Sequence, residues 1–289
     1  MIAVFFATIC AASIAPPPLF GEDVDANGTK GHATTDVTSD VAWIGPAQEF
    51  HIIVAITPDV GWHTYWENPG DSGAPTEIEI EAPEGYVVGE PIFPRPEIFR
   101  TQEETTYGYG KQAAIFVPVK APSSTLDGQA EFKVTTSWLA CKKRCVQGES
   151  ETNFVLSVRT FEEGPLRKST SLPRWQSALP KSLEELENGS AQIRGTMLKI
   201  TGTSDEAYVS FIGIEKPGVR FLGFPTVTKQ NTLFTLSTPI SLDALNANDA
   251  PFEVSGLLVI GRAQSDPSFK VTLFVDNEHK PYFGRGDHK

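Results

Sequence analysis

Two cysteines, Cys141 and Cys145, are the residues whose type and spacing most directly suggest chemistry. They lie in the segment SWLACKKRCVQGE, and the residues between them, Lys142, Lys143 and Arg144, are all cationic. A disulfide joining them would close a short ring and would destabilise the unfolded chain by only about 2 kcal/mol. Such a bridge is a modest structural staple, whereas at an open hairpin tip it would be accessible to a partner's thiolate.

The positive charges between the cysteines favour a reactive pair. Nearby cations stabilise a thiolate and lower the pKa of its thiol, and stabilising the reduced form makes a disulfide easier to reduce. Hairpin tips are also often basic because they are solvated, so a structural bridge stays the alternative. A metal site would need two more ligands. The nearby candidates, His51 and His63, have no motif spacing to the cysteines, and we assign no metal ligand.

The composition of the chain narrows the class of protein. Of its 289 residues 40% are hydrophobic and 21% charged, which is typical of a folded protein. The 22 prolines and 24 glycines favour many short strands joined by turns over long helices. The formal net charge of −12 argues against nucleic acid as a partner, because phosphate binding needs a basic surface.

The N-terminal residues are typical of a signal peptide. Residues 2–15 are apolar or small, and no charge precedes Glu22. This length fits the hydrophobic region of a signal peptide and is too short to span a membrane. We therefore expect an exported protein without a membrane span, in which Cys10 is removed and a disulfide can persist.

Short segments of strand-like sequence follow. They are rich in β-branched and aromatic residues and are separated by turn residues. They are 49–58, 61–73 with a turn from residue 68, 76–83, 86–99, 112–122, 130–140 and 152–161. About seven strands at this spacing predict an antiparallel β-sandwich of immunoglobulin type.

A polar segment with two prolines divides the chain into two parts. The second part is also rich in β-type residues and predicts a smaller β-sandwich-like domain with one short helix. The expected order is a signal peptide (1–20), a flexible leader (21–38), the first sandwich (39–161), a linker (162–174), the second domain (175–278) and a tail (279–289).

The helical signal lies in the segment RWQSALPKSLEELENGS, residues 174–190. Ser182 and Glu185 have the spacing of a capping box, and Gly189 is placed to end the helix. We expect the helix between these residues.

Four motifs occur in an order that resembles a known family. They are GWHTYWENPGDSGAP, PIFPRPEIF, TYGYGKQAAIFVPV and TSWLACKKRCVQGES. Together they are similar to the N-terminal periplasmic region of the thiol:disulfide interchange protein DsbD family, in particular its suppressor-of-copper-sensitivity branch. The resemblance implies an immunoglobulin-like domain with an accessible cysteine pair.

The resemblance also implies an activity and partners. A thioredoxin-like or membrane-embedded electron-transfer protein would reduce the pair, which would then reduce disulfides of periplasmic proteins. The reaction would be thiol–disulfide interchange, a protein-disulfide reductase activity that needs no bound cofactor. By the family's pattern, Cys145 would be attacked and Cys141 would resolve the mixed disulfide.

The same resemblance implies roles for several aromatic residues. The family has a cap loop that shields the cysteines until a partner docks. The segment TTYGYG matches its place, so Tyr107 and Tyr109 are cap candidates. Tyr65 and Trp66 fall where the family has aromatic residues near the cysteines, and Trp138 lies close to them in sequence. Each of these could instead be an ordinary core residue.

The chain departs from the family in two respects. Its cysteines are closer together than those of the classical member. In addition, no CxxC motif and no transmembrane segment follow residue 165, so either the electron donor would be a separate chain or the sequence has acquired another role.

Two other functions stay open on the sequence. The first is a non-catalytic module that binds protein or other ligands and has a structural disulfide, with the four tryptophans Trp43, Trp62, Trp66 and Trp138 as a platform. The second is metal handling, because two thiolates favour a soft ion such as Cu(I).

Overall fold

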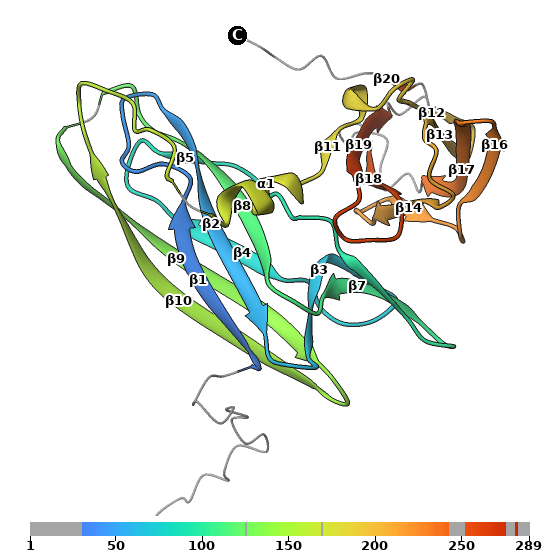
Figure 1. Ribbon diagram of the computed structural model, residues 1–289, viewed down its shortest axis with the longest axis horizontal. Helices are drawn as coiled ribbons and strands as arrows, with labels where there is room; N and C mark the ends of the chain where they lie inside the picture. Colours follow the sequence, from blue (N-terminus) through green and yellow to red (C-terminus); the bar gives the residue numbers. More distant parts are fainter. Residues whose placement is uncertain (1–30, 125, 169, 243–251, 276–280, 283–289) are drawn as a thin grey trace, which may run out of the picture.

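A computed structural model describes residues 31–124, 126–168, 170–242, 252–275 and 281–282. Four hydrogen-bonded sheets form two β-sandwiches, and the short helix α1 (Leu172–Ser177) lies between them in sequence (Figure 1). The predicted all-β fold, an antiparallel immunoglobulin-like sandwich followed by a second β-rich part, is confirmed.

The first sandwich is formed by two sheets. Their strands are β1 (Ala33–Ser39), β2 (Glu49–Pro58), β3 (His63–Gly70), β4 (Glu77–Glu81), β5 (Val87–Val88), β6 (Glu97–Arg100), β7 (Thr105–Tyr109), β8 (Ala113–Lys120), β9 (Gly128–Cys141) and β10 (Cys145–Val158). One sheet has the order β1-β2-β8-β5, and the other has the order β10-β9-β3-β7-β6 with β4 also paired to β9.

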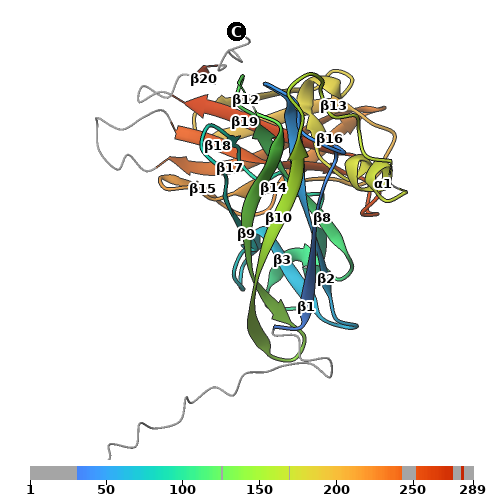
Figure 2. The same ribbon diagram turned by 90° about the vertical axis from the view of Figure 1, so that its left-hand side faces the viewer.

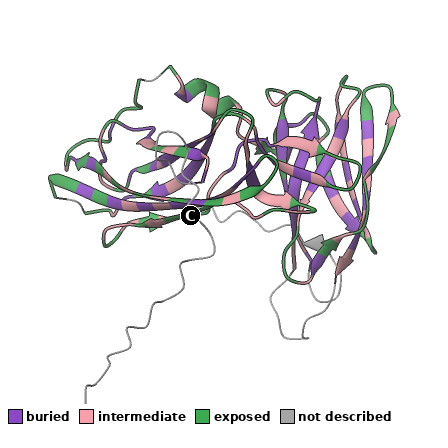
Figure 3. Cartoon of the chain, turned by 90° about the horizontal axis from the view of Figure 1, so that it is seen from below, coloured by how far each residue is buried: buried purple, intermediate pink, exposed green. Residues whose placement is uncertain are grey.

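Strand β2 illustrates why this part of the chain folds as two layers. Phe50 and Ile52 point between the sheets, where they pack in a cluster with Phe132 of β9. Ile53 points to the outer face, where it packs in a cluster with Leu172 of α1. Because both faces of β2 are covered, its sequence is almost continuously apolar. Figure 3 shows the buried positions gathered on the inner faces of both sandwiches.

The second sandwich has its own two sheets and its own core. Its strands are β11 (Lys181–Ser182), β12 (Ser190–Arg194), β13 (Met197–Thr203), β14 (Val209–Ile214), β15 (Val219–Phe221), β16 (Thr226–Gln230), β17 (Leu233–Leu242), β18 (Phe252–Ile260), β19 (Ser268–Val275) and β20 (Pro281–Tyr282). The orders are β11-β19-β18-β14, with β20 on β19, and β12-β13-β17-β15, with β16 on β17. Among the described residues, no sheet combines strands from both sandwiches.

The two sandwiches meet at an apolar seam. Trp66 and Tyr109 of the first pack in one cluster with Ile212 and Leu257 of the second. Arg95, which is 3% exposed, crosses the seam with its guanidinium group. It donates hydrogen bonds to the backbone carbonyls of Ile260, Gly261, Asp266 and Pro267 at 2.7–3.1 Å. The seam therefore fixes the second sandwich against β3 and β7.

The structure corrects the predicted flexible leader. Residues 33–39 form strand β1, which pairs with β2, so the ordered chain begins earlier than residue 39. The segment ATTDVTS has a single large apolar residue, Val37, and therefore gives little strand signal. The predicted signal peptide, Cys10 and residues 283–289 of the tail lie outside the described residues.

The predicted helix between Ser182 and Gly189 is also wrong. The capping box of Ser182 and Glu185 is present, but it begins only the 3-10 turn Leu183–Glu185. Lys181 and Ser182 pair with β19, which holds the backbone extended just before the turn. The regular helix, α1, lies earlier and crosses the end of the segment expected to be a linker (162–174). The domain boundaries themselves stay a prediction.

Candidate redox site

The cysteine pair lies at the tip of the long β9–β10 hairpin. Cys141 ends β9 and Cys145 begins β10, and the antiparallel register places them directly opposite each other. They form a disulfide, with their Cα atoms 4.1 Å apart. In Figure 2 this tip lies at the bottom of the first sandwich, whereas the second sandwich lies at the top.

The two cysteines are not equally accessible. Cys141 is 4% exposed, because β3 lies beside it in the sheet. Cys145, on the edge strand, is exposed. An incoming thiolate can therefore reach Cys145, and Cys141 is the sulfur that would be released into the protein.

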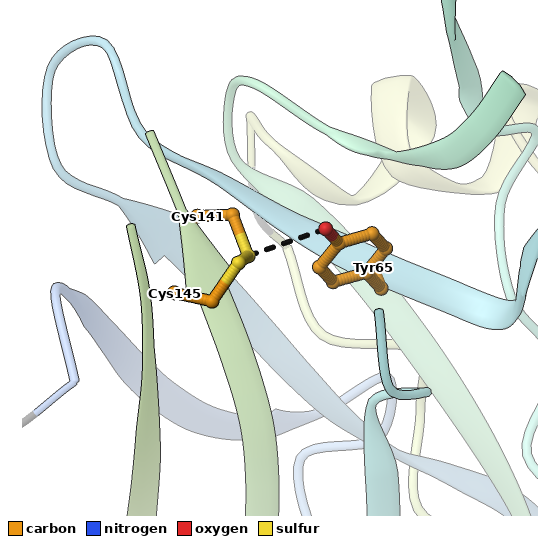
Figure 4. Close-up of a disulfide and its surroundings, with 3 residues drawn as sticks. All are labelled: Tyr65, Cys141 and Cys145. Carbon is orange, nitrogen blue, oxygen red and sulfur yellow. Dashed lines mark hydrogen bonds between the residues drawn. A yellow bond between two sulfur atoms is a disulfide. The ribbon is translucent and has the colours of Figure 1, made fainter. Parts of the chain in front are cut away.

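Tyr65 of β3 contacts the buried sulfur. Its hydroxyl donates a hydrogen bond to Cys141 Sγ at 3.2 Å (Figure 4). The side chain is 3% exposed. Burial raises the pKa of the phenol, and the nearby carboxylate of Glu104 raises this pKa further, so the hydroxyl keeps its proton. A protonated donor at this place can stabilise a thiolate on Cys141.

Backbone packing holds the Tyr65 ring in position. Gly73 has a φ of +101°, and a Cβ on it would overlap the Tyr65 ring. Thr76 donates a hydrogen bond from its hydroxyl to the Tyr65 carbonyl at 2.6 Å. The end of the first sequence motif and the threonine that follows it therefore wrap the chain closely around the tyrosine.

The three cations between the cysteines are exposed. The backbone N–H of Lys142 donates to the carbonyl of Arg144 at 3.1 Å and closes the turn. The ammonium of Lys142 reaches the carbonyl of Val60, 3.4 Å away in the β2–β3 turn. The hairpin tip and the β2–β3 turn therefore form one continuous surface.

Trp138 and Trp66 lie near the hairpin but play different parts in the packing. Trp138 donates from its indole N–H to the carbonyl of Gly31 at 2.8 Å, and its ring lies against Gly148 on β10. Trp66 packs at the seam with the second sandwich. Among the described residues, Tyr65 is the one predicted aromatic with a hydrogen bond to a cysteine.

The cap candidates lie on β7. Tyr109 is fully buried and donates its hydroxyl proton to the carbonyl of Pro94 at 2.8 Å. Tyr107 is half-buried, with its ring edge toward Trp66. No described hydrogen bond or ring contact joins either tyrosine to a cysteine. Their assignment as cap residues stays a prediction.

The sequence did not predict that His63 lies opposite Cys141 or that Phe99 stacks on His63. His63 pairs with Cys141 across β3 and β9, and its ring stacks on Phe99 at 4.6 Å. Burial lowers the pKa of His63, although the charge of Glu97 partly opposes this effect. His63 and Tyr65 are two residues apart on one strand, and this alternation was the available signal. His51, by contrast, bonds to Asp40.

A known protein family matches the part of the chain that forms the first sandwich. Residues 33–157 match the family described as thiol:disulfide interchange protein DsbD, N-terminal. This segment is therefore similar to the DsbD N-terminal family. The matched segment includes both cysteines and the strands of the first sandwich up to residue 157 of β10, which confirms the resemblance seen in the sequence motifs.

One solved structure extends the likeness of fold beyond residues 33–157. The N-terminal periplasmic domain of ScsB from Proteus mirabilis matches with a TM-score of 0.52 and 18% identity, covering 85% of this chain and 94% of that one. BcpA*(D312A), the major pilin subunit of Bacillus cereus, matches with a TM-score of 0.29 and 11% identity, over 90% of this chain and 69% of that one. Among curated proteins, none matches the chain. No helix in the described ranges is long and apolar enough to cross a membrane.

Proposed function

We propose that this chain is a thiol–disulfide carrier that passes electrons between partner proteins through Cys141 and Cys145. The observation that carries the proposal is the disulfide at a hairpin tip with one exposed and one buried cysteine. The family match supports the same chemistry. The site of action is the periplasm, where disulfides persist. The electron donor is a thioredoxin-like or membrane-embedded electron-transfer protein.

Reduction of the carrier begins at the exposed sulfur. A thiolate of the donor attacks Cys145 Sγ, the bond between the two cysteines breaks, and Cys141 leaves as a thiolate with the electron pair. A second thiol of the donor, as its thiolate, then attacks the donor sulfur of the mixed disulfide. Cys145 is released, and the donor becomes oxidised. Two electrons have then moved to the carrier.

Delivery to a substrate protein follows the reverse order. The Cys145 thiolate attacks a disulfide of the substrate and releases one substrate thiolate. The Cys141 thiolate then attacks Cys145 Sγ, which releases the second substrate thiolate and restores the disulfide. The substrate gains two electrons, and no bound cofactor is required.

The surroundings of Cys141 suit a sulfur that alternates between disulfide and thiolate. The Tyr65 hydroxyl is already 3.2 Å from Sγ in the oxidised protein, so no rearrangement is needed when negative charge develops there. The adjacent Lys142 and Lys143 favour the thiolate by their charge. Both effects make the disulfide easier to reduce than a structural bridge.

Trapping of mixed disulfides tests this proposal. In Cys141→Ser, Cys145 should react with a partner and stay bound, because no second cysteine can release it. Periplasmic extracts should therefore give discrete adducts that disappear with reductant. Cys145→Ser is the matched control and should trap far less, because its remaining cysteine is buried. Equal trapping by both variants, or none by either, would contradict the assignment of Cys145 as the attacked sulfur.

The reduction potential separates the carrier from the alternative of a binding module with a structural bridge. Equilibration with glutathione redox buffers should give a potential above roughly −300 mV, the level below which structural disulfides typically lie. A pair that stays oxidised at lower potentials would support the structural bridge.

A further inference from the structure

We propose that the surface around Cys145 recognises its redox partners by charge, and that the fitting partner presents a reactive cysteine within an acidic rim. This inference rests on the proposed exchange function and adds the chemical class of the partner. The recognition surface consists of the turn that holds Lys142 and Lys143 and the neighbouring turn with Val60 and Gly61.

The two turns make one docking surface because they touch. Lys142 donates from Nζ to the carbonyl of Val60 at 3.4 Å, and its aliphatic stem lies over Gly61. Val60 is 96% exposed, so an apolar side chain stands beside the cations. Cys145 is exposed at the edge of the same surface. A partner thiolate aimed at Cys145 must therefore approach through this positive region.

The charge of the surface is opposite to that of the rest of the molecule. The whole chain carries a formal charge of −12, and the three consecutive cations stand out against it. Acids do occur nearby. Asp59 pairs with His32 at 2.9 Å, and Glu104 acts on Tyr65. Asp59 is thus partnered within the first sandwich, Glu104 is exposed, and Lys142 and Lys143 are exposed to solvent.

A polarised surface of this kind selects partners in two ways. The cations attract an acidic partner, whereas the negative remainder of the molecule repels one that approaches from elsewhere, so productive encounters concentrate at Cys145. A basic partner would be repelled at the tip and attracted to the wrong faces. Because the attacking group is itself an anionic thiolate, the same field also favours its approach.

The test measures how fast the oxidised protein reacts with three synthetic peptides. Each has one cysteine, and they differ only in flanking residues, which are four Glu, four Gln or four Lys. Each rate is divided by that of the same peptide with the uncharged 2-hydroxyethyl disulfide, which removes differences in thiol reactivity. At low ionic strength the Glu peptide should react about tenfold faster than the Lys peptide, and 0.5 M salt should abolish most of this ratio.

Charge variants locate the effect. In the double variant Lys142→Ser and Lys143→Ser, the ratio should fall to about threefold or less. The matched control, Lys120→Ser with Lys168→Ser, changes net charge equally at exposed positions, and Lys120 pairs with Glu49 at the end of β2 away from the cysteine tip. It should keep the wild-type ratio. Thermal unfolding and a thiol count establish that each variant is folded and oxidised.

The outcomes separate this inference from the function on which it rests. If all three peptides open the disulfide at similar normalised rates, or if the double variant keeps the wild-type ratio, charge recognition at this surface is wrong and exchange stands. If no peptide opens the disulfide, the proposed exchange function is wrong, and the assignment of an acidic partner is then wrong as well.

Discussion

The phenol of Tyr65 donates a hydrogen bond to the sulfur that would leave when the disulfide opens. A disulfide sulfur is a weak acceptor, whereas a thiolate is a strong one, so this bond gains strength during reduction. The residue is therefore positioned to favour the reduced state more than the oxidised state.

Tyr65→Phe tests this difference at the scale of one residue. We expect reduction of the disulfide by dithiothreitol to slow by roughly tenfold, because a hydrogen bond to a charged group is lost. The equilibrium with glutathione should shift toward the oxidised form. Tyr86→Phe is the control, because Tyr86 packs on Phe132 away from the cysteines. An unchanged rate in Tyr65→Phe would show that the contact is only structural.

At the scale of elements, the β9–β10 hairpin is the support for the redox site. Its strands pair without interruption from Cys141 and Cys145 to Gly128 and Val158. Near the cysteines, the ring of Trp138 lies over Gly148, and its indole binds the carbonyl of Gly31. The absence of a side chain at residue 148 allows this packing.

Gly148→Ala should disturb the hairpin without changing any charged or sulfur group. A Cβ at this position would overlap the Trp138 ring, so we expect the unfolding free energy to fall by about 1–3 kcal/mol. Denaturant unfolding of the oxidised protein measures the change. Gly128→Ala, on the same hairpin but with open space around its Cβ, should change stability by less than about 1 kcal/mol. Similar losses in both variants would argue against the packing explanation.

The sequence was informative where local pattern decides the structure. The apolar run at residues 49–58 predicts β2 at its observed bounds, and alternation at residues 76–83 predicts β4. Strand β1 escaped prediction because its polar residues are held by pairing with β2, which local pattern does not encode. The helix expected after Ser182 failed for a related reason, since pairing with β19 overrides the capping signal.

The redox site, like the fold, could be predicted only in part from the sequence. The spacing and charges around Cys141 and Cys145 could be read directly from the chain. Their unequal burial and the placement of His63 opposite Cys141 could not, because cross-strand register depends on the whole sheet. Only the family resemblance suggested that Tyr65 lies near the cysteines.

For the whole molecule, the seam between the sandwiches contains a half-buried carboxyl group. Glu67 follows Trp66 on β3 and lines a cleft of about 850 Å³ between the two sandwiches, together with Lys216 and Lys270. Burial raises the pKa of Glu67 to about 7, and Glu90 adds to the increase, although the two lysines oppose it. Near neutral pH this carboxyl group is therefore only partly ionised.

The raised pKa of Glu67 predicts a pH dependence of stability. The folded protein holds the proton on Glu67 more tightly than the unfolded chain does. The stabilisation that this proton gives the fold is therefore complete below pH 4.5 and is lost as the pH rises toward 7. Glu67→Gln should remove this decline and raise the unfolding free energy at pH 8 by roughly 1–3 kcal/mol. Denaturant unfolding at pH 5 and pH 8 measures it. Exposed Glu79→Gln is the control, and a decline preserved in Glu67→Gln would contradict the prediction.

The opposition of Cys141 and Cys145 in the hairpin ladder has a consequence for repeated turnover. Their Cα atoms are held 4.1 Å apart by a register that the flanking strand pairs also enforce. Opening the sulfur bond would leave the two side chains as neighbours, so the ring could close again without a conformational search. Each cycle would then require little reorganisation of the backbone, and the sandwich would keep one shape in both oxidation states.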